Sequence, residues 1–459
     1  MLSILLLTLM VLVTVGFLLG RSRAAAVGAP GDVKMHSLAG YHGWYVAAWV
    51  GIPAFLLVLL WLLFQGPVVD WLLVASLPAD RTEGLGKGQL DLLVSEIKSV
   101  AAGNVFGEPD AEVLAAAERY NSWNEIADWA MFAVAVSMAL VAILVARSRI
   151  APRFRARNNV ERIMSGLMIA CSLIAILTTL GIVVSLLYET LRFLDKVSVI
   201  EFLTGLRWEP QIPIREGQVT AGGAFGAIPV FTGTLLIAFL AMLVAVPIGL
   251  FAAIYLTEYA SRRVRAVIKP LLEILAGIPT VVYGFFAVLT VAPAMRNFGQ
   301  AIGFDIAPNS ALAAGGVMGI MLIPFISSLS DDAIGSVPQA MRDGSYGLGA
   351  TKGETITKVL LPAALPGIMG GILLALSRAI GETMIVVMAA GIIASLTMNP
   401  LEPVTTVTVQ IVTLLIGDTE FDNPKTLAAF ALGLVLFLVT LVLNVIALQI
   451  VRRYREQYE

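Results

Sequence analysis

Residues 229–256 read PVFTGTLLIAFLAMLVAVPIGLFAAIYL, and no charged side chain interrupts them. The run exceeds the roughly 20 apolar residues that a helix needs to cross the hydrocarbon core of a bilayer. It is continuous and does not alternate between apolar and polar positions, which favours a membrane helix over a barrel strand. The segment therefore predicts a membrane-spanning helix.

Eight more predominantly apolar runs occur along the 459 residues, so we expect an all-α, polytopic membrane protein with about nine transmembrane helices. They cover residues 1–20, 44–64, 127–146, 163–187, 269–292, 309–330, 367–396 and 427–451. The composition agrees, with 58% hydrophobic and 14% charged residues and a mean hydropathy of +0.88. These values exclude a cytosolic enzyme, and the net charge of −2 gives no basic footprint for nucleic acid.

The charged residues predict the orientation, because lysine and arginine gather in cytoplasmic loops. One alternating set of connectors carries 19 of the 30 basic residues and the other set carries 10. With nine spans, this bias predicts a multi-pass inner-membrane protein with a periplasmic N-terminus and a cytoplasmic C-terminus. Two arginines follow the first run and no basic residue precedes it, which favours a retained helix over a cleaved secretory signal.

Two blocks are expected. Residues 1–155 carry three spans and a long outer insert at 65–126, in which Leu90–Val100 and Ala111–Tyr120 have helical spacing. This insert is either a solvated helical cap or a docking surface for an outside partner. Residues 160–459 carry six spans, with the longest inner connector at 331–366.

No energy source is visible in the sequence. The nearest strings to a phosphate-binding Walker loop, at Gly86 and Thr351, do not fit its pattern. Cys171 lies alone in an apolar run, and His36 and His42 stand in a polar connector without other ligands, so we expect no metal site and no cofactor bound by this chain. If transport is powered, another polypeptide supplies the power.

The inner connector carries the most informative segment, MRDGSYGLGATKGETITKVLLP at residues 341–362. It predicts a short helix, a glycine break and a second short amphipathic helix, with Pro362 and Pro366 marking the return into the membrane. A helical hairpin on the inner face would suit the transmission of force from a soluble motor.

This segment resembles the conserved loop of permease subunits in binding-protein-dependent ABC importers, which reads E-A-A-x-x-x-G, nine residues, then I-x-L-P. The matching residues are Asp343, Gly344, Ser345, Gly349, Val359, Leu361 and Pro362. The spacing is kept in full, and Gly344 for alanine is the one substitution that is not conservative. The resemblance implies that these residues dock into a groove of a partner ATPase.

The six-span block further resembles the PstC-type permeases of phosphate importers. The matching strings are FLTG at 202–205, RWEP at 207–210, FGAIP at 225–229, PIG at 247–249, YLTEY at 255–259, LEILAGIPTVVYG at 272–284 and RAIGETM at 378–384. The resemblance implies three kinds of partner besides lipid: a second, PstA-type permease, two PstB-type ATPase subunits that bind the ATP, and a periplasmic PstS-type phosphate-binding protein. It does not extend over the first 155 residues, which look like an extension found in longer members.

Four residues are candidates for the translocation path. Arg378 and Glu382 are four residues apart in an apolar run, so they are expected to share a helix face and to pair, either lining the path or only fastening helices together. Glu273 either lines the path or pairs with Lys269 or Arg265 near the inner face. Tyr283 is a packing or lining residue.

Three other functions stay open from the sequence alone. The chain could be an ABC permease for another oxyanion such as sulfate, molybdate or phosphonate. It could be a secondary transporter or channel that needs no ATPase. It could also be a membrane subunit that signals phosphate status.

Overall fold

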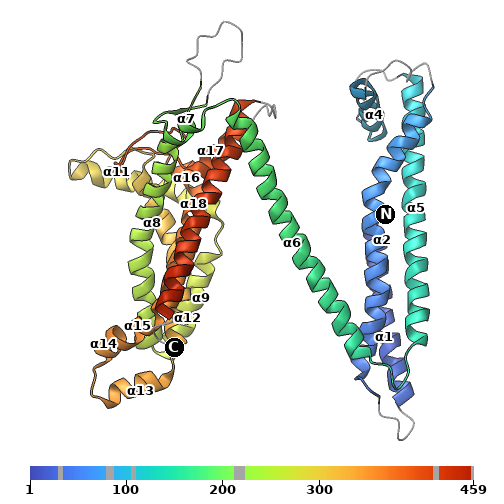
Figure 1. The fold of residues 1–459 in the computed structure, drawn as a ribbon, viewed down its shortest axis with the longest axis horizontal. Coiled ribbons are helices and arrows are strands. Elements are labelled where there is room, and N and C mark those ends of the chain that lie inside the picture. Colours follow the sequence, from blue (N-terminus) through green and yellow to red (C-terminus); the bar gives the residue numbers. More distant parts are fainter. Residues whose placement is uncertain (29–34, 79–86, 105–109, 211–222, 417–422, 456–459) are drawn as a thin grey trace. The chain divides into compact units, whose positions relative to one another are not determined.

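The computed structural model describes residues 1–28, 35–78, 87–104, 110–210, 223–416 and 423–455. The regular secondary structure of these residues is helical apart from one pair of two-residue strands, which confirms the all-α fold class (Figure 1). The chain divides into two compact units, Met1–Leu177 and Thr178–Glu459. The sequence placed this boundary at residues 155–160, whereas the division between the units falls inside helix α6 (Ala156–Leu194). The expected domain boundary stays a prediction.

Unit 1 is built on three long helices that pack side by side: α1 (Leu2–Gly28), α2 (Ala39–Ala75) and α5 (Ala111–Ser148) (Figure 1). Their shared core is rich in small and branched side chains such as Val46, Val50 and Ala139. His42 is fully buried on α2, so its expected place in a solvated connector was wrong.

The insert of unit 1 is helical in its described part. α2 and α5 extend into it, and α4 (Lys87–Ala101) packs against α5 through Ile97 and Ala116. Lys98 Nζ donates to Asp70 Oδ2 of α2 at 2.7 Å. Both helical segments expected here, at 90–100 and 111–120, are present. Whether the insert is a cap or a docking surface stays open.

Helix α6 (Ala156–Leu194) passes from unit 1 into unit 2. Its apolar window has none of its residues buried within the chain, whereas the corresponding window of α12 (Ala311–Gly335) is 61% buried. The exposed apolar side chains of this window can therefore face lipid or a partner chain.

Unit 2 is organised around α8 (Ile228–Ile254) and α12, which pack along most of their length. Glycine makes this possible, since a Cβ at Gly319 of α12 would lie 2.8 Å from the Cβ of Val244 on α8. Small residues at such positions let two membrane helices approach closely. The core continues through Met318, Leu322 and Ile326, which are buried on α12.

The span expected at 269–292 is wrong in its first part. α9 (Arg262–Ala276) ends before Gly277 and has no buried residue, and α10 (Thr280–Phe286) begins after Pro279. The spanning segment continues through the π-helical turn η2 (Ala287–Val291) into α11 (Ala292–Ala301). A backbone break at Gly277–Pro279 thus separates an amphipathic helix from the span, because Pro279 cannot supply the next helical N–H.

One end of unit 2 carries the α13–α14 hairpin, with α13 (Gln339–Gly347) and α14 (Lys352–Thr355) at the bottom of Figure 1. α14 continues through the π-helical turn η3 (Ile356–Leu360) into α15 (Leu361–Ile380). Pro362 and Pro366 were expected to mark the return into the membrane, and both lie inside a candidate spanning helix that already begins at Lys352. The ring of Pro362 would crowd the carbonyl of Lys358, but that carbonyl lies in the wider π turn.

The opposite end of unit 2 is capped by short elements: α7 (Val199–Thr204), strands β1 (Trp208–Glu209) and β2 (Ala224–Phe225), α16 (Met384–Ala389) and α17 (Val407–Leu415). The strands are antiparallel, with Trp208 opposite Phe225. Trp208 Nε1 donates to Gln410 Oε1 of α17 at 2.8 Å, which ties this sheet to α17. The span expected at 367–396 was wrong beyond Ile380, where the helix ends.

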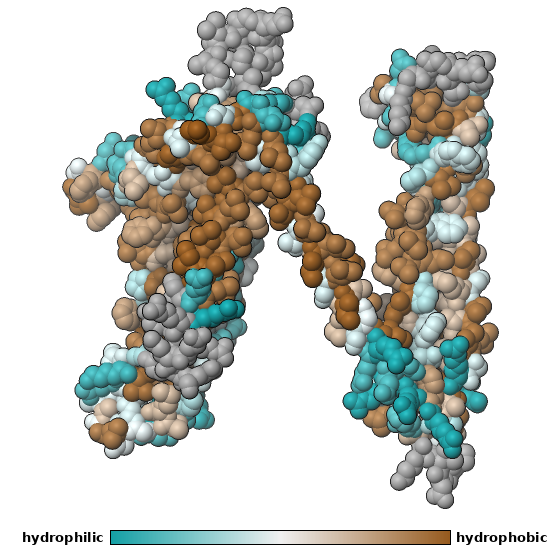
Figure 2. Space-filling view, viewed as in Figure 1, coloured by the Kyte–Doolittle hydropathy of each residue, from teal (hydrophilic) through white to brown (hydrophobic). Residues whose placement is uncertain are grey.

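Helix α18 (Pro424–Arg455) packs along α15 and completes the unit. Within the described residues, nine helices are long and apolar enough to span a membrane, which confirms the expected number. In Figure 2, each unit shows a brown apolar band along its helices with teal hydrophilic residues at its ends, as expected for helices that cross a bilayer.

Candidate functional site: the α13–α14 hairpin and the Arg378 region

The turn of the α13–α14 hairpin is fixed by two successive caps. Ala350 N donates to Ser345 O at 3.1 Å and Gly349 N donates to Tyr346 O at 2.9 Å, which is a Schellman motif closing α13. Gly349 has φ = +84°, a left-handed conformation that costs other residues about 1–2 kcal/mol. The loop pattern therefore requires glycine at position 349 because of the backbone conformation of the turn.

The second cap starts α14. Thr351 Oγ1 accepts from Glu354 N at 3.4 Å, and Glu354 Oε2 accepts from Thr351 N at 2.9 Å, which completes a capping box. The Schellman motif ends at Ala350 and the capping box begins at Thr351, so no residue lies between the two motifs and the turn has little freedom to vary its angle.

Buried polar contacts hold α13 against the membrane helices. The ion pair between Arg342 and Glu258 of η1 (Tyr255–Tyr259) has a nitrogen–oxygen distance of 3.3 Å, and its side chains are 11% and 9% exposed. Arg342 also donates to the backbone carbonyls of Ile334 and Val337, at the end of α12. One arginine thus connects the hairpin to two different helices of the core.

Two further contacts join the second arm of the hairpin to the same place. Lys352 Nζ donates to Glu258 O and lies 4.6 Å from the ring centroid of Tyr259. Ser345 Oγ and Thr355 Oγ1 share a buried hydrogen bond of 2.9 Å between the arms. The hairpin is therefore fastened both to itself and to η1.

The outer side of the hairpin is open and concave. The structure brings four of the expected docking residues together around a hollow of about 500 Å³: Gly344, Ser345, Gly349 and Val359. Leu348 stands beside them with 92% of its side chain exposed. Asp343 is exposed and accepts a 3.0 Å hydrogen bond from Gln339. Leu361 and Pro362 belong to α15 and do not line this hollow.

A second polar cluster lies between α9 and α12. Asp331 of α12 is buried and accepts from Arg265 at 2.8 and 2.9 Å, from Lys269 at 2.8 Å and from Thr257 at 2.6 Å. The hydrogen bond that the Lys269 ammonium donates to Asp331 raises the pKa of Lys269 above its usual value. Asp331 therefore holds α9 against α12.

This cluster corrects the expectation for Glu273. Both cations proposed as its partners are bound to Asp331, and Glu273 itself is exposed on α9, outside the membrane-spanning segments. Glu273 lines a cleft of about 210 Å³ with Lys269 and Ser327.

Arg378 and Glu382 do not share a helix face, because α15 ends at Ile380. Glu382 is buried and its Oε1 accepts from Met384 N and Ile385 N at 3.1 and 3.4 Å, so it caps α16. Arg378 is exposed and lies 5.9 Å from the ring centroid of Phe325. Among the ion pairs of the described residues, none includes Arg378, so the expected pairing was wrong.

Tyr283 is a packing residue in this structure. Its ring is buried in the core of unit 2 and its hydroxyl donates to Leu275 O at 2.8 Å, across the Gly277–Pro279 break. The contact stabilises the break between α9 and α10.

Comparison with known proteins supports the sequence patterns. A family model described as "Binding-protein-dependent transport system inner membrane component" matches residues 245–456, and one described as "Phosphate ATP-binding cassette transporter" matches residues 6–178. The chain is 31% identical over 331 residues to the phosphate transport system permease protein PstC of Mesorhizobium japonicum, covering 68% of this chain and 95% of that protein. The chain belongs to the PstC-type ABC transporter permeases.

The comparisons also find a second relative and a likeness to a solved structure. A probable ABC transporter permease protein, YqgH of Bacillus subtilis, is 36% identical over 273 residues, which is 59% of this chain and 84% of the relative. A solved bacterial alginate ABC transporter chain aligns over 66% of this chain and 99% of its own, at 18% identity and a TM-score of 0.45. PstC-type permeases are non-enzymatic membrane components, and a separate subunit hydrolyses ATP.

Sequence reasoning missed the residues that fasten the hairpin. Arg342 stands beside Asp343 of the loop pattern, and Glu258 lies inside the YLTEY string, but no spacing rule joins residues so far apart in the chain. Asp331 was placed in a connector, whereas the structure buries it near the end of α12. The sequence alone did not reveal that Thr257, Arg265 and Lys269 all donate to Asp331.

Proposed function

We propose that this chain is the permease subunit of an ATP-driven phosphate importer and forms half of its translocation path. The single observation that carries the proposal is the match over nearly the full length of a PstC-type phosphate permease. The expected partners are a second PstA-type permease, two PstB-type ATPase subunits and a periplasmic PstS-type phosphate-binding protein. In this assignment the hairpin end is cytoplasmic and the N-terminus is periplasmic, in keeping with the bias of the basic residues.

The α13–α14 hairpin would receive the ATPase in the hollow that contains Gly349 and Val359. A push on α13 would reach η1 through the Arg342–Glu258 ion pair. A push on α14 would reach the membrane directly, because α14, η3 and α15 form one continuous helix from Lys352 to Ile380. This helix carries Arg378 near its far end, so motion at the hairpin and motion at the path are mechanically linked.

Arg378 is our candidate for contact with the anion. A guanidinium presents a planar fork of donors that fits phosphate oxygens. A charge at membrane depth costs at least about 2.5–3.5 kcal/mol, and Arg378 has no ion-pair partner among the described residues. An anion in the path, or the second permease across it, would offset that cost. Glu382 would not contact the anion itself and would instead hold the start of α16 beside the path.

The test is uptake of labelled phosphate by cells that lack their own phosphate permeases. This chain would be supplied with its neighbouring permease, ATPase and binding protein, with sulfate and molybdate as competitors. We expect saturable phosphate uptake that neither competitor inhibits. Uptake of another oxyanion in place of phosphate, by a membrane-inserted complex, would overturn the substrate and leave the permease family standing.

A coupling variant separates ATP-driven import from a channel. Gly349→Asp places a charged side chain at the left-handed turn position, and we expect it to abolish uptake while the protein still reaches the membrane. Undiminished uptake in this variant would contradict the role of the hairpin. Phosphate-dependent gene regulation, measured in the same cells, would reveal a signalling role that survives without transport.

A further inference from the structure

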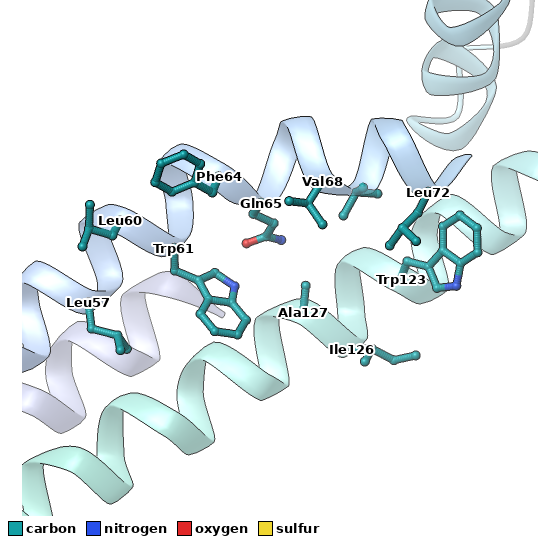
Figure 3. A pocket seen from close by; sticks show the side chains of 11 residues that line it. Leu57, Leu60, Trp61, Phe64, Gln65, Val68, Leu72, Trp123, Ile126 and Ala127 are labelled. Atoms are coloured by element: carbon teal, nitrogen blue, oxygen red, sulfur yellow. The ribbon is translucent and has the colours of Figure 1, made fainter. Parts of the chain in front are cut away.

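Two grooves lie between α2 and α5 of unit 1, one toward each end of the helix pair. The first, here called the Gln65 groove, has a volume of about 520 Å³ and is lined by Trp61, Phe64, Gln65, Val68, Trp123 and Ile126 (Figure 3). The second, here called the Arg149 groove, has a volume of about 220 Å³ and is lined by Trp49, Pro53, Met138, Val141, Val145 and Arg149. Both have apolar walls of the size and chemistry that suit a hydrocarbon chain.

The two grooves differ in their polar groups. In the Gln65 groove, Gln65 Nε2 donates to Asp128 Oδ1 at 3.1 Å, and no cation lines the pocket. Figure 3 shows Gln65 between the two helices with apolar side chains on either side. The Arg149 groove instead has a guanidinium, because Arg149 is the residue that ends α5. The lining of the Gln65 groove thus carries no charged side chain, whereas the lining of the Arg149 groove carries one arginine.

The charge around Arg149 is not neutralised within the described chain. Arg147, Arg153 and Arg155 are also exposed, and none of these four arginines has an ion-pair or hydrogen-bond partner for its side chain among the described residues. The neighbouring Arg157 does have one, since it pairs with Glu161 at 2.6 Å. Arg149 lines the apolar groove, and Arg147, Arg153 and Arg155 lie close to it in the sequence. An anion that also carries apolar chains would match both the guanidinium group of Arg149 and the apolar walls of the groove.

We propose that the Arg149 groove is a binding site for an anionic phospholipid. One acyl chain would lie along Pro53, Met138 and Val141, and the headgroup phosphate would accept hydrogen bonds from Arg149. Trp49 has 43% of its surface exposed beside the groove, and tryptophan favours the level of the lipid headgroups. Basic pockets between membrane helices bind anionic headgroups in this way. The proposal concerns unit 1 alone and is independent of the transported substrate.

The experiment is native mass spectrometry of the purified full chain, delipidated in detergent and offered equal amounts of phosphatidylglycerol and phosphatidylcholine. We expect the native chain to retain phosphatidylglycerol preferentially. Arg149→Gln should weaken phosphatidylglycerol retention about fivefold, the contribution of one arginine near an anionic surface. Val141→Trp should reduce the retention of both lipids, because the indole would fill the groove.

Two matched variants control for general effects. Arg162→Gln removes an arginine of the same basic segment that does not line the groove, and Val68→Trp fills the Gln65 groove on the same two helices. Both should keep the native preference for phosphatidylglycerol. Equal loss in Arg162→Gln and Arg149→Gln would mean diffuse charge attraction and would overturn the site. Unchanged retention in Arg149→Gln, with an unchanged thermal unfolding midpoint, would also overturn it.

Discussion

Arg342 and Arg378 belong to the same unit of this permease and have opposite surroundings. The side chain of Arg342 is 11% exposed and contacts Glu258, Ile334 O and Val337 O. Arg378 is exposed, lies 5.9 Å from the ring centroid of Phe325 and has no ion-pair partner among the described residues. An arginine whose donors are used inside the chain fixes structure, whereas an arginine whose donors are free is available to a partner or a substrate. We therefore expect substitution of Arg342 to lower the stability of the protein, and substitution of Arg378 to lower transport without loss of stability.

The largest loss of stability is expected for Arg342→Met. The change leaves the Glu258 carboxylate buried without its cation, and breaking a buried pair in this way costs about 3–5 kcal/mol. Thermal unfolding of the purified protein in detergent measures the effect. The double variant Arg342→Met with Glu258→Leu should recover part of the loss, because no buried charge is left unpaired. A double variant as unstable as the sum of the two single variants would contradict the pairing.

The next largest loss is expected for Asp331→Asn. The amide keeps the shape of the carboxylate but removes the charge that binds Arg265 and Lys269, and charged hydrogen bonds contribute about 1.5–3 kcal/mol. The neighbouring Asp332→Asn is the control. Asp332 is 67% exposed and its contact with Lys269 is 3.3 Å, so its removal should cost less than about 0.5 kcal/mol. Equal costs at the two positions would show that burial of Asp331 does not matter.

A smaller effect is expected at the hairpin turn. Gly349→Ala should cost about 1–2 kcal/mol, because alanine must adopt φ = +84° although the surrounding space is open. Gly353 is also surrounded by open space but lies inside α14, so Gly353→Ala should instead stabilise the protein by about 0.5–1 kcal/mol. Changes of the same sign in both variants would refute the backbone explanation. ATPase stimulation by the binding protein should fall in Gly349→Ala.

The sequence predicts the local features of this protein, but it does not predict the contacts that depend on how its helices pack. The number of spans was predictable because twenty apolar residues have few alternatives to a membrane helix, although two spans were misplaced in part. The break at Gly349 was predictable because a left-handed turn requires glycine. The Arg342–Glu258 pair was not predictable, since it depends on how η1 and α13 pack. Glu382 was expected on the same helix as Arg378 because periodicity alone does not reveal that α15 ends at Ile380. Glu382 lies beyond that end and caps α16.

The smallest loss of stability, together with a large loss of transport, is expected for Arg378→Gln. Since Arg378 has no ion-pair partner among the described residues, its replacement should shift the free energy of unfolding by less than about 0.5 kcal/mol. Loss of a charged hydrogen bond to phosphate, about 1.5–3 kcal/mol, should lower uptake by about 10- to 150-fold. Arg378→Lys keeps the charge without the planar fork, so it should recover only part of the uptake. A destabilised Arg378→Gln variant would place Arg378 in the same structural class as Arg342, and stable protein with native uptake would remove it from the path.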